Sequence, residues 1–395
     1  MPDPKTICTV RANGMVFRSW KSITISHPYG DLIPTFQLVC SEGGPLGGAN
    51  DSRRLVPQTP VTIELGGQLA LTGAIEQRLA SYDANSHDVI IGGRSQSSVA
   101  TLSSMPFTGG NLNGFSAEQA ARAALAPHGT NLVVKNPPAN WSKPFPFLAV
   151  NPGEYVHEFL ERIFKMRGAF AWGDEKGNIC VGQGDPKAAV VAELQEGRNI
   201  LRATVKLDDQ GIFSAMHIYG QQPGQGDDMS VRTAEGVATD PSAKTTRVFH
   251  QHAEMNCDSQ DATARANLEA ARSSWDRVEA TVTVAGWFRP DGSLWGLTDN
   301  ISFYSPMGLP NGTGKMPSDN PLGVQNIVYS QDSENGTTTT LTLVRAALLT
   351  STPPANVQSD GKGGYVGDGP SAATPVAPDY QSGISIGPGG QLGHA

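Results

Sequence analysis

The chain has 395 residues, which is enough for two to four domains of about 100–200 residues each. Only 17% of the residues are charged, while 45 Gly and 28 Pro predict a turn-rich protein with more β than α structure. The net charge of −8 and the lack of a basic tract exclude a general nucleic-acid binder. No apolar run approaches the ~20 residues of a membrane span, and the N-terminus lacks a secretory signal pattern. We therefore expect no membrane insertion.

The first β unit is predicted over residues 1–99. Asn13-Gly14, the strongest short hairpin signal, stands between two apolar runs. Alternation of apolar and polar residues then predicts strands at 22–25, 35–39, 61–65, 69–81 and 87–92. We expect these strands to form an antiparallel β-barrel-like domain. The Gly/Pro-rich stretch 41–60 is long for a connector, which favours a functional or interface loop.

A small α+β domain is predicted over residues 100–195. Ser116 and Gln119 form the capping box of a first helix. Residues 151–184 then predict a second helix, ended by Gly168 and followed at once by a hairpin. One face of that helix is apolar at helical spacing, through Val156, Phe159, Leu160, Ile163 and Phe164. Such a unit needs another surface to bury this face, so we interpret it as a docking module.

The β pattern returns over residues 196–350, which predict a second β-barrel domain with insertions. Strands are expected at 201–207, 213–219, 248–252, 280–286, 325–329 and 338–344, and Asp258 or Ser259 should cap a helix that runs to Trp275. The polar stretch 221–242 predicts a mobile insertion, and residues 351–395 predict a flexible Gly/Pro-rich C-terminal tail. The fold class is therefore mainly β with α+β, in which two antiparallel β-barrel-like domains flank a small helix–hairpin domain.

Few residues suggest chemistry. His250 and His252 alternate on a strand, which places two imidazoles on one face as weak candidate metal ligands. A third ligand at a firm spacing is missing, so surface or interface histidines are the favoured interpretation, and we expect no metal and no cofactor. Residues 383–387 (GISIG) fit a hydrolase motif that needs a strand-to-helix turn in a large sheet. They lie in the predicted tail, so we predict no enzymatic activity.

The helix of residues 151–168 leaves two further interpretations open. Glu154, Glu158 and Glu161 suit paired catalytic carboxylates, but their places near the start and outer face of an amphipathic helix favour a solvated face. The opening of this helix is also similar to that of LysM peptidoglycan-binding domains. Those domains have a second helix where this chain has a hairpin. A LysM-like tail or cell-wall-associated module is therefore the alternative function.

Several short stretches resemble the baseplate hub proteins of contractile-tailed bacteriophages of the Mu type, related to the late-control protein D family. The stretches are residues 10–14 (VRANG), 20–23 (WKSI), 71–75 (LTGAI), 81–84 (SYDA) and 91–95 (IGGRS), and the helix entrance at 151–168 fits the same family.

The resemblance implies a structural homotrimer with two barrel domains per chain. These domains would form a pseudo-sixfold ring that joins a hexameric tail tube protein to a trimeric central spike protein, beside other baseplate proteins. It also implies transient DNA passage through the ring, and a place in the virion tail baseplate after assembly in the host cytoplasm. Free passage predicts a neutral to negative lumen, with Arg53, Arg54 and Arg247 outside it and Asp227 and Asp228 near its rim.

Overall fold

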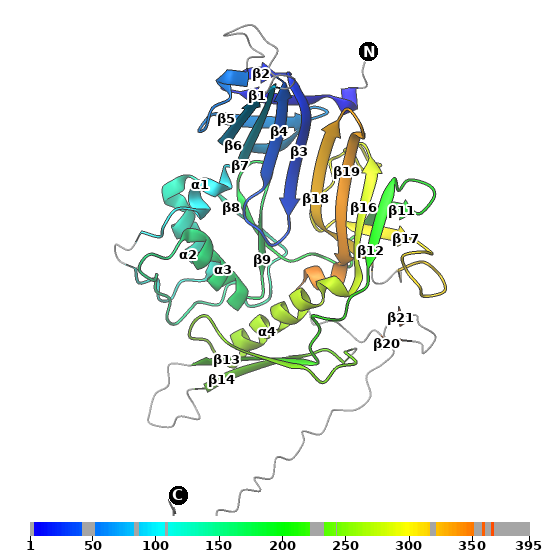
Figure 1. Ribbon diagram of the computed structural model, residues 1–395. Coiled ribbons are helices and arrows are strands. Elements are labelled where there is room, and N and C mark those ends of the chain that lie inside the picture. The colour runs from blue at the N-terminus through cyan, green and yellow to red at the C-terminus, as the bar shows by residue number, and fades with distance from the viewer. Residues whose placement is uncertain are drawn as a thin grey trace, which may run out of the picture.

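The computed structural model describes residues 4–41, 52–82, 87–106, 110–221, 233–241, 243–316 and 321–350, together with 358–359 and 365–366. The fold is mainly β, as predicted, with a large sheet above and a helical layer to one side and below (Figure 1). Loop residues 42–51, most of the 221–242 stretch with Asp227 and Asp228, and the 383–387 motif lie outside the described residues. Of the C-terminal tail, only the pair β20 (Gln358–Ser359) and β21 (Tyr365–Val366) is described.

One sheet of 13 strands contains both β units. Its path runs β12-β16-β19-β18-β3-β4-β7-β6-β5-β1-β2, and β17 joins β11 to β18. The strands are β1 (Cys8–Ala12), β2 (Met15–Phe17), β3 (Trp20–Pro28), β4 (Thr35–Ser41), β5 (Pro60–Leu65), β6 (Gln68–Tyr82), β7 (His87–Ser95), β11 (Val190–Gln195), β12 (Arg202–Lys206), β16 (Glu279–Ala285), β17 (Asn300–Tyr304), β18 (Leu322–Asp332) and β19 (Gly336–Arg345).

The predicted hairpins are confirmed. Asn13 and Gly14 have φ of 49° and 75°, the left-handed pair that a tight β1–β2 turn requires. At the β18–β19 turn, Gly336 has a left-handed φ of 70° where β19 begins. Alternation also holds along the strands, since Ile23 and Ile25 of β3 are buried and their neighbours are partly exposed.

The predicted barrel form of the two β units is wrong. β3 pairs with β4 on one edge and with β18 on the other, so the two units share one open sheet in which the described residues form no closed barrel. The physical reason is that a strand has donors and acceptors on both edges, and each unit covers the open edge of the other. The apolar faces meet in one core, where Ile25 and Phe36 share a cluster with Leu341.

The middle unit follows its predicted pattern. It contains α1 (Ser97–Thr101), α2 (Ala117–Leu125), the short helix η3 (Ala126–His128), α3 (Val156–Met166) and a sheet of β8 (Leu132–Lys135), β10 (Ile179–Gly182) and β9 (Phe170–Gly173). Ser116 and Gln119 make the expected capping box, with bonds of 3.3 and 2.9 Å. All five residues of the predicted apolar face of α3 are buried, and Gly168 follows α3 at φ 66°.

Glu154 departs from its predicted solvated position. It precedes α3, is buried, and accepts from Arg162 Nη2 at 2.9 Å and from the Asn151 N–H at 2.9 Å. The carboxylate therefore fixes the entrance of the helix, because buried charges persist where they are paired and hydrogen-bonded. No pair of catalytic carboxylates results, because Glu154 is occupied by this pairing.

A three-stranded sheet packs below helix α4 (Ser259–Ser273), which Asp258 caps as predicted. Its strands run β14 (Thr233–Thr239), β13 (Ala215–Gln221), β15 (Val248–His252). β14 corrects the prediction that 221–242 is wholly a mobile insertion. Its inward residues Ala234, Gly236 and Ala238 are small enough for the strand to approach α4 closely, and this explains why hydrophobicity did not reveal it.

Buried ion pairs tie α4 to the middle unit. Arg167, fully buried after α3, lies 2.6 Å from the Asp261 carboxylate at the start of α4. Lys143 reaches the same carboxylate at 3.2 Å. The short helix η5 (Trp275–Val278) connects α4 to β16, and η6 (Ala346–Leu349) follows β19. The Trp275 indole donates to the Leu348 carbonyl and so joins these two helices.

Candidate functional site

The outer face of the large sheet is lined by small hydroxyl side chains. We call it the hydroxyl face; it comprises Ser22, Thr24, Ser26, Thr35, Thr281, Thr283, Ser330, Thr340 and Thr342, all at least partly exposed. The strand registers place them on one side of the sheet across both β units. Thr283 and Thr340 confirm this arrangement through a hydroxyl contact of 3.0 Å. Charged residues border this face: Lys21 pairs with Asp88 at 2.6 Å, and Arg202 of β12 lies opposite Thr283 in the strand register.

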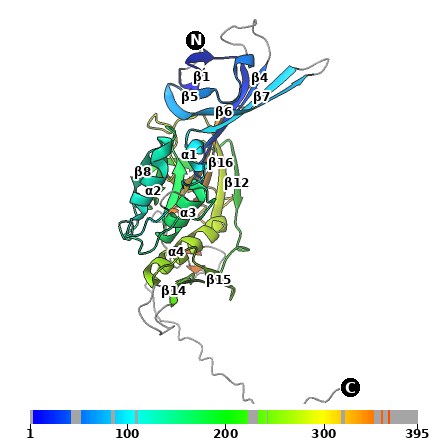
Figure 2. The same cartoon turned by 90° about the vertical axis from the view of Figure 1, so that its left-hand side faces the viewer.

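Two strand edges at opposite ends of this face pair with nothing in the described chain. β12 bonds only to β16, so its other edge is open. Beyond Ile75, β6 leaves β5 and pairs only with β7, so residues 76–82 also present an open edge. Figure 2 shows the β6–β7 hairpin extending beyond its neighbours. Leu79 of β6 is 55% exposed, and Leu201 directly before β12 is 61% exposed. Exposed apolar side chains on an unpaired strand are typical of strands that bind another chain.

The predicted histidine pair lies on the exposed face of the β14-β13-β15 sheet. His250 stacks on His217 of β13 with ring centroids 4.9 Å apart, and its Nδ1 is 3.1 Å from the Tyr219 hydroxyl. His217 Nδ1 donates to Glu235 at 2.8 Å. Partial burial and the Glu235 carboxylate raise the pKa of Tyr219.

Sequence reasoning grouped His250 with His252 but missed His217, which strand pairing brings directly opposite. The alternation of β13 was the available signal. Within the described ranges no group of three or more His, Cys, Asp or Glu side chains is arranged to hold a metal ion. His250 and His252 therefore stay weak candidate ligands by prediction, on an exposed surface as the favoured interpretation expects.

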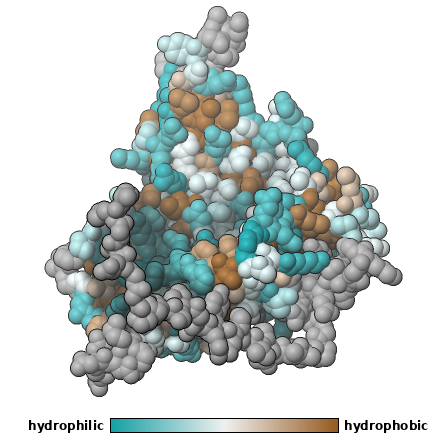
Figure 3. All heavy atoms as spheres, turned by 60° about the horizontal axis from the view of Figure 1, so that its bottom comes forward, coloured by the Kyte–Doolittle hydropathy of each residue, from teal (hydrophilic) through white to brown (hydrophobic). Residues whose placement is uncertain are grey.

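The arginines predicted to lie outside a channel are exposed. Arg53 and Arg54 form part of the short helix η2 (Ser52–Arg54), and Arg54 Nη1 lies 3.2 Å from Met15 Sδ of β2. Arg247 precedes β15 and donates to the Asp209 carbonyl at 3.0 Å, which holds the small sheet to the segment after β12. Figure 3 shows the molecule from its lower end, where hydrophilic residues on the surface are interspersed with small groups of hydrophobic residues. No helix among the described residues is long and apolar enough to cross a membrane.

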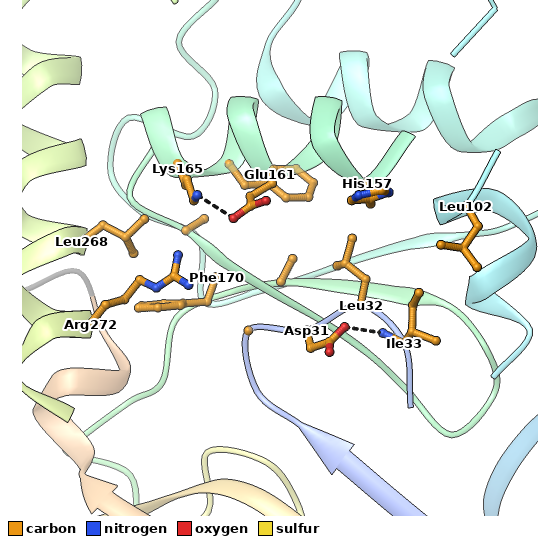
Figure 4. Close-up of a pocket in the computed structure, with 14 residues that line it drawn as sticks. Asp31, Leu32, Ile33, Leu102, His157, Glu161, Lys165, Phe170, Leu268 and Arg272 are labelled. Carbon is orange, nitrogen blue, oxygen red and sulfur yellow. Dashed lines mark hydrogen bonds and ion pairs between the residues drawn. The ribbon is translucent and has the colours of Figure 1, made fainter. Parts of the chain in front are cut away.

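A groove of about 300 Å³ opens between α3, α4 and the β3–β4 connection. We call it the α3–α4 groove (Figure 4). Phe164, Phe170 and Leu32 form its apolar surface, and Leu102 stands at the far end with 41% exposure. Lys165 pairs with Glu161 inside it, and Arg272 of α4 points in from the other end. An apolar pocket of this size with a few polar groups is typical of binding sites.

Two family models of phage baseplate proteins match parts of this chain. Residues 7–95 match the model of the Mu phage baseplate assembly protein GpP-like N-terminal domain. Residues 102–183 match that of the second domain of gp44-like baseplate hub proteins. The predicted resemblance to Mu-type hub proteins is confirmed, and the relatives that the chain matches are structural phage tail proteins.

A relative in sequence is the baseplate hub protein gp44 of Escherichia phage Mu, 27% identical over 293 residues, which are 73% of this chain and 76% of gp44. In structure, a 43 kDa tail protein of prophage MuSo2 from Shewanella oneidensis matches at a TM-score of 0.72 and 22% identity, over 87% of this chain and 99% of that one. A tail protein from Neisseria meningitidis MC58 matches at 0.71 and 20%, over 88% and 98%. These comparisons give no support to a LysM-like module.

Proposed function

We propose that this chain forms a homotrimeric ring that adapts a hexameric tail tube to a trimeric central spike and lets DNA pass. The observation that carries the proposal is the pair of open strand edges at opposite ends of the hydroxyl face. Sheet edges that match in direction close into rings when the same contact repeats around an axis. The ring would lie in the virion tail baseplate, beside other baseplate proteins, after assembly in the host cytoplasm.

Topology supports a duplication within the chain. The first unit places its strands in the order β3-β4-β7-β6, and the second unit in the order β12-β16-β19-β18. In chain order, both are first, second, fourth, third. Two such units per chain would give three chains six similar units, which suits a sixfold partner on one side and a threefold partner on the other. The predicted division into domains 1–99, 100–195, 196–350 and 351–395 is retained as part of this proposal.

The junction inside the chain gives a template for the junction between chains. The third strand of the second unit, β18, pairs antiparallel with the first strand of the first unit, β3. Their counterparts with open edges are β6 and β12. We therefore expect β6 of one protomer to pair antiparallel with β12 of the next. This pairing would bury the exposed Leu79 and Leu201. Burial stabilises the contact by about 25 cal/mol for each Å² of apolar surface removed from water.

Cross-linking tests this contact in the full chain. The native thiols are all buried, and burial raises the pKa of Cys8, Cys40 and Cys257 to about 12, so they react poorly. A chain with Leu79→Cys and Thr204→Cys should give a covalent trimer with a short bis-maleimide, and either substitution alone should not. A folded monomer at micromolar concentration by native mass, with no cross-linked trimer, would contradict the proposal.

Free passage of DNA depends on the hydroxyl face lining the ring. Small neutral groups release no counterions from DNA, whereas rows of Lys and Arg would hold the phosphates. We therefore expect the trimer not to bind a fluorescent DNA duplex at the physiological ionic strength of about 0.15 M. Tight binding that weakens steeply with salt would indicate a DNA-gripping surface and overturn this part of the proposal.

A further inference from the structure

The α3–α4 groove has an unusual cation at one end. The arginines around it each have a carboxylate partner: Arg162 with Glu154, Arg167 with Asp261, and Arg265 with Glu254 and Glu269. Arg272, one turn after Glu269 on α4, is half-buried and has no hydrogen bond or ion pair to any residue that the structure describes. A guanidinium presents five donors in a rigid fork suited to a carboxylate.

The other charges in the groove determine which kind of ligand Arg272 can bind. Lys165 is neutralised by Glu161 at 2.5 Å, so Arg272 is the cation left over at this end. Between the two ends, on the lower side of the groove, Asp31 accepts from the Ile33 N–H at 3.1 Å (Figure 4). With Glu161 paired to Lys165, the groove offers Arg272 as a single cation and no row of cations that could hold a polyanion such as DNA or RNA. The apolar surface of Phe164, Phe170 and Leu32 between the ends calls for an apolar side chain.

We propose that the α3–α4 groove binds a short segment of a partner protein in which a carboxylate stands beside an apolar side chain. The carboxylate pairs with Arg272, and the apolar side chain covers Phe170 and Leu32. The exposed Leu102 extends the apolar contact toward the far end. This interaction does not depend on the contact between protomers through β6 and β12. A failure of the proposed ring would therefore leave this proposal intact, and the reverse also holds.

A peptide experiment on the full chain tests the pairing. The probes are two fluorescein-labelled peptides, Gly-Leu-Glu-Leu-Gly-amide and the same peptide with Gln in place of Glu, and the readout is fluorescence anisotropy. We expect the Glu peptide to bind the native chain about tenfold more tightly than the Gln peptide, as for a hydrogen bond to a charged group. Arg272→Gln should abolish this preference, and Arg272→Lys should keep part of it.

Arg122→Gln is the matched control. Arg122 lies on α2 outside the groove and pairs with Glu118 in an exposed position, so this variant should keep the full preference. Equal binding of the two peptides to the native chain, no binding of the Glu peptide up to millimolar concentration, or a preference that persists in Arg272→Gln would overturn the proposal. If Arg272→Glu instead breaks the oligomer, measured by native mass, the occupant is a second copy and the proposal is wrong. Melting temperatures of all variants establish that each is folded.

Discussion

The buried histidine at the junction of the two β units should make this junction sensitive to acid. His27 on β3 is 8% exposed, and its Nε2 donates to the Ala70 carbonyl at 2.9 Å, which leaves Nδ1 without a proton. Its ring meets Tyr329 of β18 edge to face at 6.4 Å. Burial lowers the pKa of His27 from 6.5 to about 4, although the Ala70 carbonyl and Asp174 oppose this shift. A proton on Nδ1 would place a charge in the shared core.

The sign and size of the effect follow from these two pKa values. Between pH 6.5 and about 4 the unfolded chain binds a proton at His27 that the folded chain does not. The free energy of unfolding therefore falls as the pH is lowered through this range. At about 1.4 kcal/mol per pH unit, the loss is about 3 kcal/mol when complete. His27→Gln keeps a donor for Ala70 but cannot be protonated, so it should lose this part of the acid dependence.

Urea denaturation at fixed protein concentration, repeated at intervals from pH 7 to pH 4, measures the effect. The quantity to compare is the difference in free energy of unfolding between native and His27→Gln chains, because the carboxylates titrate alike in both. His128→Gln, in the short helix η3, is the control and should follow the native curve. Parallel curves for native and His27→Gln chains would refute the reasoning that His27 is held neutral.

Three further changes probe the packing. Asp261→Asn leaves the fully buried Arg167 without its anion and should cost about 3 kcal/mol by denaturation; a cost below 1 kcal/mol would show that the Arg167–Asp261 pair does not set the α3–α4 contact. Gly236→Ala places a Cβ 2.1 Å from the backbone of Ala262 and should cost about 2 kcal/mol or more, whereas Gly92→Ala, with its nearest atom at 3.9 Å, should cost far less. Phe159→Asp buries an unpaired charge in α3 and should abolish soluble folded protein, while Phe159→Leu should not; an unchanged melting temperature in the Asp variant would contradict the buried face.

Local patterns predicted most elements of the fold. Alternation located strands such as β3 and β16, and the helical repeat located the buried face of α3, because each pattern depends only on near neighbours. β14 escaped because its inward residues are small and carry little hydrophobic signal. The single sheet escaped as well, since no alternation pattern reveals that the partner of β3 lies about 300 residues further along the chain.

The candidate sites needed the three-dimensional structure for the same reason. His250 and His252 were visible as a pair, but His217 and Glu235 join them only through pairing of β15 and β14 with β13. Arg272 looks like an ordinary last-turn cation of α4. Its meaning depends on the groove that the β3–β4 connection and α3 complete from distant parts of the chain.

The pairing of β3 with β18 has a consequence for synthesis on the ribosome. β3 emerges early, but β18 (Leu322–Asp332) follows only after most of the chain has been made, at roughly 5–20 residues per second. For that interval the nascent first unit presents a bare strand edge, and neighbouring ribosomes on one message hold identical chains at high local concentration. An edge that binds β18 in its own chain would bind β18 of a neighbour equally well. Early folding of the first unit therefore lengthens the time during which its β3 edge can pair with another chain. Slowing translation ahead of residue 322 should increase the fraction of strand-swapped oligomers.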